Sequence, residues 1–504
     1  MKAFARLLHA EWTKLRTVPG WVIGTAAGVL AIVGLGLLPG MQGSCGRHGP
    51  ESECRAPVGP EGQQVTDSFT FVHQALTGDG AITARVTSLT GLISQPDGPA
   101  PRSGLVPWAK AGLIVKDGTG QGSSYAAVMV TGGHGVRMQD NYVHDRAGWP
   151  GAVTGASPRW LRLVRTGNTI TGYESVDGMG WTLVGSAVLK GLPATVQAGL
   201  FVTSPQYAQA VRESLATSGA GGGPTQATAA FDRLDHQGTR SGGAWVNEII
   251  GGSPHAPELG RGRVEQAGDG FRVTGSGDIA PAVAGAAGAG TSITQTLVGT
   301  FAGLIFMVVV GTLFVTAEYR RGLIRTTLTA SPPRGRVLAA KALIVGAVTY
   351  LAGLVAAAVV VIFGQRVLRG NGVYVLPAST ATELRVVAGT AALLAVAAVL
   401  ALAIGAVLRR SAAAVAAAIV GTVLPYLLAV SVLPTGAAQW LLRVTPAAAF
   451  AVQQSVVQYP QVDNVYTPAA GYFPLAPWNG FAVLAGWTAL TLGLAMFLLR
   501  RRDA

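Results

Sequence analysis

Six long apolar stretches recur along the chain, and none of them contains a charged residue. A helix needs roughly 20 residues to cross the ~30 Å hydrocarbon layer of a membrane. We therefore predict six transmembrane helices, at 21–38, 297–315, 343–363, 386–408, 412–433 and 481–499. The first stretch is too long for the apolar region of a signal peptide and lacks a small-x-small cleavage site before Pro39, so it is expected to remain as an anchor.

The segment between the first two stretches, residues 39–292, has a different pattern. Short runs that favour β-structure alternate with Gly, Asp and Asn turns, and they predict strands at 81–89, 111–117, 124–132, 160–178 and 197–204. Such regular spacing predicts an antiparallel β-sandwich over about 65–235. Residues 218–228 are predicted to form a flexible spur or linker, and 236–292 one last strand and a tether to the second helix.

Two further segments are amphipathic. Residues 1–17 carry an apolar stripe at Phe4, Leu7, Leu8, Trp12 and Leu15 opposite basic residues, which predicts a helix lying in the membrane interface; a plain charged N-terminus is the alternative. The outer loop 434–479 is half apolar and is predicted to hold re-entrant or interfacial helices. The predicted segments are the interfacial helix 1–17, the first span 18–38, the insert 39–292 and the second span 293–317. They continue with the cytoplasmic loop 318–341, spans three to five in 342–433, the outer loop 434–479, the sixth span 480–499 and the cytoplasmic tail 500–504.

Charge fixes the predicted orientation. Only 12% of the residues are charged, about half the share usual in soluble domains. Residues 39–292 hold 18 Lys/Arg and 19 Asp/Glu, whereas the remainder of the chain holds 19 Lys/Arg and 5 Asp/Glu. Of the 19 basic residues in this remainder, 15 lie in alternate loops and at the two ends of the chain. The positive-inside rule then places both termini and residues 318–341 in the cytoplasm and the insert outside, in a multi-pass protein of the cell membrane. Nucleic-acid binding is excluded as an explanation of the net charge of +13.

The chain has no motif that would bind or hydrolyse nucleotide. No G-x-x-x-x-G-K-[ST] loop occurs, and no ionisable residue lies within the six apolar stretches to couple transport to protons or sodium. Histidines are dispersed through the insert without metal-ligand spacing. We expect neither an enzyme nor a metal or cofactor in this chain, so transport would need energy from a separate subunit.

The sequence TAEYRRGLIRTTLTASPPRGR, residues 316–336, lies between the second and third stretches. It has five arginines, a small apolar face at Leu323, Ile324 and Leu328, and two prolines that end a helix. Glu318 is expected to set the start of this short helix, and Gly322 to permit close approach of a partner. Such a cationic cytoplasmic helix is suited to docking into another subunit.

This loop resembles the first cytoplasmic loop of ABC-2-type ABC transporter permeases, and HAEWTKLRT and RVTPAAAFAVQQ resemble other parts of that family. The resemblance implies an exporter subunit that pairs as a dimer with two cytoplasmic ATP-binding subunits, which bind the ATP. By resemblance, residues 318–329 form the coupling helix, with partner contacts from Glu318, Tyr319, Arg320, Arg321, Gly322, Leu323, Arg325, Thr326 and Leu328. The large insert departs from the family pattern. A membrane-anchored sensor or glycan-binding protein without transport activity is the alternative.

The insert resembles a concanavalin-like lectin/glucanase sandwich in DSFTF, KAGLIVKD and WLRLVRTGNTITGYESVDGMGWTLVG. The last piece predicts a hairpin turn locked by Ser175, Asp177, Gly178 and Trp181. One interpretation is contact with a cell-envelope glycan or cargo through exposed Trp108, Tyr142 or Trp149. The alternative is a structural sandwich with Trp160 and Trp181 in its core. Hydrolysis is rejected, because the odd spacing of Glu174 and Asp177 sends their carboxylates to opposite faces of a strand.

The two cysteines, Cys45 and Cys54, follow the first apolar stretch closely. Outside the cytoplasm they are expected to form a disulfide, with free thiols as the alternative. Gln42 occupies the position where lipoprotein attachment to Cys45 needs a Leu-like residue, so lipidation is rejected.

Overall fold

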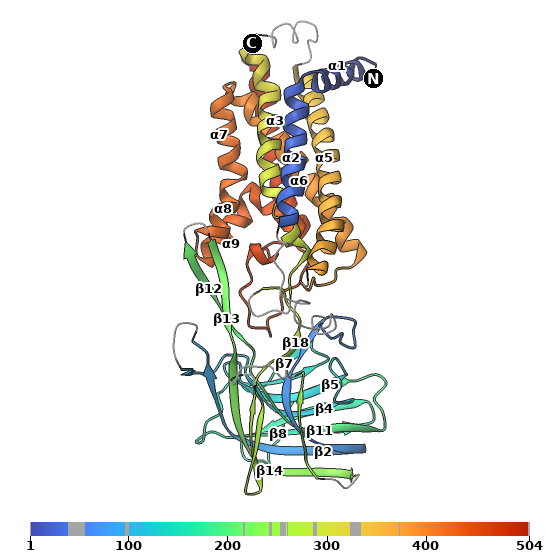
Figure 1. Ribbon diagram of the computed structural model, residues 1–504, viewed down its shortest axis with the longest axis vertical. Coiled ribbons are helices and arrows are strands. Elements are labelled where there is room, and N and C mark those ends of the chain that lie inside the picture. Colours follow the sequence, from blue (N-terminus) through green and yellow to red (C-terminus); the bar gives the residue numbers. More distant parts are fainter. Residues whose placement is uncertain are drawn as a thin grey trace.

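The computed structural model describes residues 2–38, 56–95, 100–214, 217–240, 244–251, 259, 261–285, 290–322, 334–371 and 373–501. The described chain forms a helical bundle and a β-rich body placed end to end (Figure 1). Both termini lie at the end of the bundle that is remote from the β-rich body. An insert between the first two spans therefore leaves and re-enters the bundle at the opposite end.

The six predicted transmembrane helices are confirmed as helices long and apolar enough to cross a membrane. They are α2 (Pro19–Leu37), α3 (Thr300–Arg320, preceded by η4, Ile293–Leu297), α5 (Arg334–Gly370), α6 (Thr380–Leu408), α7 with α8 (Ser411–Thr422 and Leu424–Ser431), and α10 (Pro477–Arg501). The fifth span is broken between α7 and α8 because Pro425 cannot donate the helical hydrogen bond of its nitrogen.

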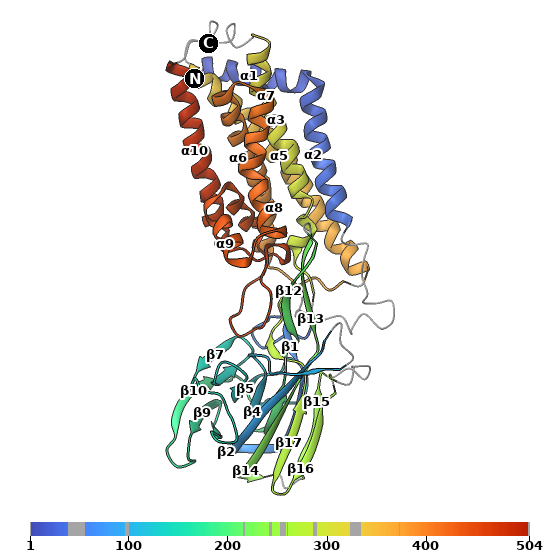
Figure 2. The ribbon, with the colours of Figure 1, turned by 90° about the vertical axis from the view of Figure 1, so that its left-hand side faces the viewer.

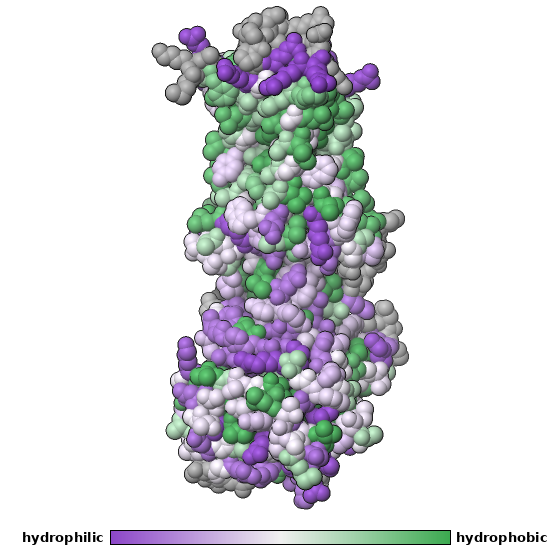
Figure 3. Space-filling model, turned by 180° about the vertical axis from the view of Figure 1, so that it is seen from behind, coloured by the Kyte–Doolittle hydropathy of each residue, from purple (hydrophilic) through white to green (hydrophobic). Residues whose placement is uncertain are grey.

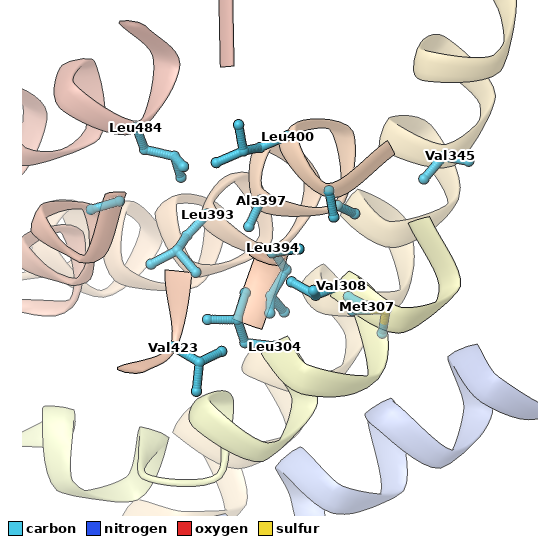
Figure 4. Packing of buried hydrophobic residues seen from close by; sticks show 14 of the residues in the cluster. Leu304, Met307, Val308, Val345, Leu393, Leu394, Ala397, Leu400, Val423 and Leu484 are labelled. Atoms are coloured by element: carbon cyan, nitrogen blue, oxygen red, sulfur yellow. The ribbon is translucent and has the colours of Figure 1, made fainter. Parts of the chain in front are cut away.

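The bundle is packed around α6. Leu304, Met307 and Val308 of α3 meet Leu393 and Leu394 of α6 in one buried cluster (Figure 4). Helix–helix packing in membranes depends on close approach of backbones, which small residues allow. Accordingly, a Cβ on Gly311 would lie 2.3 Å from the carbonyl oxygen of Ala398, so α3 and α6 touch through their backbones here.

The outer surface of the bundle is apolar. Ile23 and Leu30 of α2 and Leu490 of α10 are 65%, 71% and 72% exposed. Figure 3 shows the resulting hydrophobic band, bounded by hydrophilic residues at the end that carries the termini. A wide apolar belt of this kind is the surface expected of a protein whose solvent is lipid.

Short helices flank the spans at both ends. α1 (Lys2–Thr17) lies across the bundle at the end with the termini (Figure 2). The loop predicted to hold re-entrant or interfacial helices contains α9 (Thr435–Val444), η5 (Pro446–Gln453) and η6 (Pro468–Ala470). Every residue from Ala447 to Gln453 is buried, so η5 is part of the bundle interior rather than a surface loop.

The insert is an antiparallel sheet that folds into two layers around one core. The long β2 (Phe69–Ile93) belongs to both layers. The main path is β10-β9-β8-β2-β11-β4-β5-β6-β7, with β14 and β17 beside β2. These strands are β4 (Lys110–Lys116), β5 (Tyr125–Thr131), β6 (Val136–Asp140), β7 (His144–Ala147), β8 (Arg159–Thr166), β9 (Thr169–Ser175), β10 (Thr182–Val188), β11 (Thr195–Thr203), β14 (Thr225–Arg240) and β17 (Gly270–Gly275). The two short strands β3 (Arg102–Ser103) and β15 (Val246–Ile250) pair with β2, and β16 (Arg263–Ala267) pairs with β17.

Two segments differ from the sequence-based prediction. The predicted linker at 218–228 is instead β13 (Thr217–Gly223), which pairs with β12 (Tyr207–Ser214), and the start of β14. This hairpin extends from the sandwich to the bundle, where β13 contacts α8 (Figure 1). The predicted tether at 236–292 holds four strands and the end of β14. The start of β14 and β15 pair with β2, and β18 pairs with β1, and no local pattern in the sequence reports such long-range pairing.

Both faces of β4 are buried, which explains two lysines inside the sandwich. Leu113 and Val115 point into the core between the layers, whereas Ile114 belongs to a second cluster on the opposite face. Lys110 and Lys116 share that second face, because side chains alternate along a strand. Their side chains are fully buried.

Each buried lysine has a carboxylate partner on the segment that leads into or out of the insert. Lys116 Nζ donates to Asp67 Oδ2 at 2.8 Å, and Lys110 Nζ donates to Asp278 Oδ1 at 2.6 Å. Asp67 ends β1 (Val65–Asp67), and β1 pairs with β18 (Ile279–Pro281), which directly follows Asp278. The two ion pairs therefore hold the entry and exit of the insert together against one face of the sheet.

We predict that Lys116→Met destabilises the sandwich. Asp67 would remain buried without its cation, and breaking a buried ion pair costs about 3–5 kcal/mol. Hydrogen exchange of the β4 amides in the full-length protein measures the change in opening free energy. The matched control is Lys190→Met, because Lys190 is exposed; equal protection in both variants would contradict the prediction.

Candidate functional site

The bundle end with the termini contains a buried cluster of four charged side chains. Lys341 Nζ of α5 lies 2.6 Å from Glu318 Oε1 of α3 and 2.7 and 2.8 Å from the two carboxylate oxygens of Glu11 in α1. Lys14 of α1 also pairs with Glu318. The side chains of Lys341, Glu318 and Glu11 are only 1%, 2% and 6% exposed. With two cations and two anions, the cluster is neutral.

The cluster joins three elements that are distant in sequence. Glu11 and Lys14 are three residues apart on α1 and so lie on one face of that helix. Leu15 is buried on the same side, whereas Trp12 is 42% exposed. The helix thus packs on the bundle through a charged face, and not solely through the apolar stripe that the sequence predicts.

Burial makes this arrangement electrostatically demanding. Burial, followed by the nearby ammonium group of Lys341, lowers the pKa of Lys14 to about 8. The second carboxylate oxygen of Glu318, Oε2, has no hydrogen-bond partner among the described residues. The ion cluster requires all four of its side chains, since a buried charge that loses its partner is strongly destabilising.

Several residues assigned to the coupling helix have other places in the structure. Glu318 and Tyr319 belong to the last turns of α3, which ends at Arg320. Glu318 is buried in the ion cluster, and Tyr319 is half-buried with the Arg409 guanidinium 5.2 Å from its ring. Glu318 therefore does not present its carboxylate to a partner. The charge on this residue is used inside the bundle.

The remainder of the predicted coupling helix is partly described. Arg320, Arg321 and Gly322 are exposed at the end of α3. Gly322 has φ +67°, so it ends the helix in the left-handed conformation, and no atom of the described residues lies within 4 Å of a Cβ position there. That it permits close approach of a partner stays a prediction. Leu323, Arg325, Thr326 and Leu328 lie outside the described residues, as do Cys45 and Cys54.

Lys341 was expected in the cytoplasmic loop with its neighbours. α5 instead begins at Arg334, which places Lys341 in its second turn, facing α1 and α3. The sequence-based statement that the spans lack ionisable groups holds for the apolar stretches, but the helices themselves extend into charged residues. Glu11 was missed altogether. Its only signal is its spacing from Lys14 on a predicted amphipathic helix.

The predicted hairpin turn is present in the sandwich. Asp177 Oδ1 accepts hydrogen bonds from Met179 N at 2.8 Å and from Gly180 N at 3.0 Å, and Ser175 Oγ accepts one from Gly178 N at 3.0 Å. The two backbone N–H groups and the Ser175 hydroxyl lower the pKa of Asp177 to about 2. Gly178 has φ +80° and lies against the Trp160 ring. These contacts stabilise a turn and do not form a pocket.

The aromatic residues of the sandwich do not form a glycan platform. Trp108 is 4% exposed and stacks on His134 with ring centroids 4.1 Å apart, and Tyr142 is fully buried. Tyr142 donates to Asp67 Oδ2 at 2.7 Å, and burial raises its pKa. The expectation that these two side chains are exposed is wrong. The β1–β18 ribbon covers the face on which Tyr142 lies, and Trp108 packs between the His134 ring and the Arg137 guanidinium, which lies 5.5 Å from its ring centroid.

The remaining tryptophans are half-buried, and arginines lie over them. The guanidinium carbons of Arg159, Arg85 and Arg162 are 3.5, 5.7 and 5.7 Å from the ring centroids of Trp149, Trp160 and Trp181. The interpretation that Trp160 and Trp181 belong to the core is therefore also wrong. Trp160 lies on the outward face of β8, while Leu161 and Leu163 fill the core between the layers, and Trp181 directly precedes β10.

The sandwich is joined to the bundle through the outer loop that follows η5. Gln461 Nε2 donates to Val143 O at 3.0 Å, and Asn464 Nδ2 donates to Ala284 O at 2.8 Å. Ala284 N in turn donates to the Tyr472 hydroxyl at 3.0 Å. Because η5 is buried in the bundle, this loop links the sandwich directly to the packing of the transmembrane helices.

No group of three or more His, Cys, Asp or Glu side chains within the described ranges could hold a metal ion.

The geometry and the sequence now place the chain in a class. The family described as "ABC-2 family transporter protein" matches residues 174–504, about two thirds of the chain. The chain therefore belongs to this family, and it is a multi-pass membrane permease of an ABC transporter. Membership implies, in general, a partner subunit that binds ATP.

Other comparisons add little. No curated protein matches the sequence. Scytalido-glutamic peptidase with a peptide-based transition-state analogue is similar over 41% of this chain and 98% of its own, at 9% identity and a TM-score of 0.24. A functionally unknown protein from Saccharomyces cerevisiae is similar over 38% of this chain and 85% of its own, at 18% identity and a TM-score of 0.21. Similarity this low carries no argument about fold or function.

We predict that Lys341→Met lowers the stability of the bundle by about 3–5 kcal/mol, because two carboxylates lose their shared cation. Thermal unfolding of the purified protein in detergent measures the loss. The matched control is Arg336→Met on the same helix, whose side chain is exposed. A second variant, Lys341→Met with Glu318→Gln, is expected to recover part of the loss; a double variant with additive losses would argue against a coupled cluster.

Proposed function

We propose that this chain is the membrane-spanning subunit of an ATP-driven exporter, in which a separate cytoplasmic ATPase supplies the energy. The family match over residues 174–504 carries the proposal. The ATPase docks on the segment 318–333, which connects α3 to α5. A dimer of permease subunits forms the pathway, the termini face the cytoplasm and the sandwich faces outward.

The ion cluster supports a mechanical role for this segment. Glu318 is the first residue of this segment and Lys341 lies in α5, eight residues beyond its other end, and their side chains are 2.6 Å apart. A force applied to the segment by a docked ATPase would therefore reach α3 and α5 together rather than one helix alone. Glu11 and Lys14 extend the same connection to α1. This pairing keeps the docking segment and three helices in a fixed relation during movement.

The outward sandwich is proposed to act as a cap on the bundle. The sheet face that carries Phe71 and Phe201 is covered by β1 and β18, whose Val65 and Ile279 share a buried cluster with them. Lectin-like sandwiches need an open face for a sugar, and this one is filled by the chain itself. Contact with the outer loop, rather than with a cell-envelope glycan, is the function that these observations favour.

The docking proposal predicts that an ATP-hydrolysing subunit co-purifies with the chain from its native membrane. Leu323→Asp with Leu328→Asp is expected to release that subunit, since charges would replace the apolar face of the predicted helix. Leu92→Asp with Leu183→Asp is the matched control, because both leucines are exposed on the sandwich. A preparation that retains full transport without any ATPase would refute the proposal.

The orientation is tested by cysteine labelling of intact cells with a membrane-impermeant maleimide. In a variant with Cys45→Ser and Cys54→Ser, a cysteine at exposed Asn168 is expected to react from outside. A cysteine at Arg336, which is also exposed, is expected to react only after the membrane is permeabilised. The opposite pattern would reverse the topology.

A further inference from the structure

A cleft of about 250 Å³ lies beside the ion cluster, between α1, α2, α3 and the first residue of α7. One side of it is apolar and is formed by Val18, Trp21, Leu313 and Phe314. Trp21 stacks edge-on against Phe314, with ring centroids 5.8 Å apart. The cleft thus has a rigid apolar wall at the end of the hydrophobic band.

The rim of the same cleft is cationic. Lys14, Arg320 and Arg321 line it. Arg320 and Arg321 are exposed and form no ion pair with any residue that the structure describes. Glu318 also lines the cleft, but its charge is offset by Lys14 and Lys341. Two arginine charges therefore remain uncompensated at the rim.

We propose that this cleft binds the headgroup of an anionic phospholipid from the leaflet on the side of the termini. The phosphate would accept hydrogen bonds from Arg320 and Arg321, whose guanidinium groups suit phosphate oxygens. The start of an acyl chain would lie along Trp21 and Phe314. The inference goes beyond transport and does not depend on a docked ATPase.

Position favours a lipid over an acidic segment of a partner protein. α2 forms one wall, and its neighbouring Val22 and Ile23 are 47% and 65% exposed as parts of the apolar surface. Trp12, on the outer side of α1, is 42% exposed at the same level, as interfacial tryptophans commonly are. A ligand entering from this side comes from the bilayer, and it meets apolar surface before it meets the arginines.

The test uses the full-length permease, purified without its ATPase, and a photoactivatable phosphatidylglycerol. Cross-linking is expected at residues 14–21 and 313–321, more strongly than with the same probe built on phosphatidylcholine. Arg320→Ala with Arg321→Ala is expected to weaken phosphatidylglycerol binding about thirtyfold, because each basic residue near an anionic membrane contributes about 1 kcal/mol. Arg320→Lys with Arg321→Lys should retain most of it.

The matched control is Arg500→Ala with Arg501→Ala. These two arginines end α10 on the side of the bundle that carries the termini, and they do not line the cleft. This variant is expected to leave phosphatidylglycerol binding unchanged. An equal loss in this control would mean general attraction to a basic surface and would overturn the proposal. So would equal cross-linking by phosphatidylcholine, cross-links that map elsewhere, or complete competition by millimolar inorganic phosphate, which would identify a free anion instead. Thermal unfolding of each variant verifies that its fold is retained.

Discussion

The bundle depends on a carboxylate that is buried away from solvent. Glu318 lies near the end of a transmembrane helix with a side chain that is only 2% exposed. Unpaired charges at such positions are expensive, so the chain supplies two ammonium groups from two other elements. The position of α1, the depth of α5 and the spacing of the ends of segment 318–333 all follow from satisfying this one group.

The same principle operates at the other end of the molecule. Asp67 and Asp278 bind lysines that are buried in the sheet, and they do so where the chain enters and leaves the insert. In both places a long-range ion pair fixes the route of the chain at a junction between parts. Apolar packing provides most of the burial, but it does not specify which loop end meets which strand. A buried charge does, because it requires a partner of opposite sign within reach.

The sequence predicts those features that depend on local composition. Six spans follow from apolar length, and the locked turn at Ser175–Gly178 follows from residues within four positions of each other. Two strands of 236–292 were missed because their partners are distant in sequence: β15 pairs with β2 and β18 pairs with β1, each more than 100 residues away. The exposure of Tyr142 was misjudged for a similar reason: the segments that cover it are β1 and β18, which are brought together only by the fold. Trp108 is buried against His134, which lies 26 residues further along the chain.

The ion cluster shows why the candidate site was harder to predict than the spans. Glu318 and Lys341 flank a cationic loop, and the positive-inside rule explains each of them as loop residues. That rule counts basic residues in loops and takes no account of how far a helix extends beyond its apolar stretch. Once α3 is seen to run to Arg320 and α5 to begin at Arg334, both side chains must face the bundle or the lipid, and only the bundle offers counter-charges. Because α3 and α5 extend beyond their apolar stretches, two residues that the sequence places in a loop form a buried ion pair. The arginines that follow α3 in sequence lie past that limit, so they remain available to the membrane surface and to a partner.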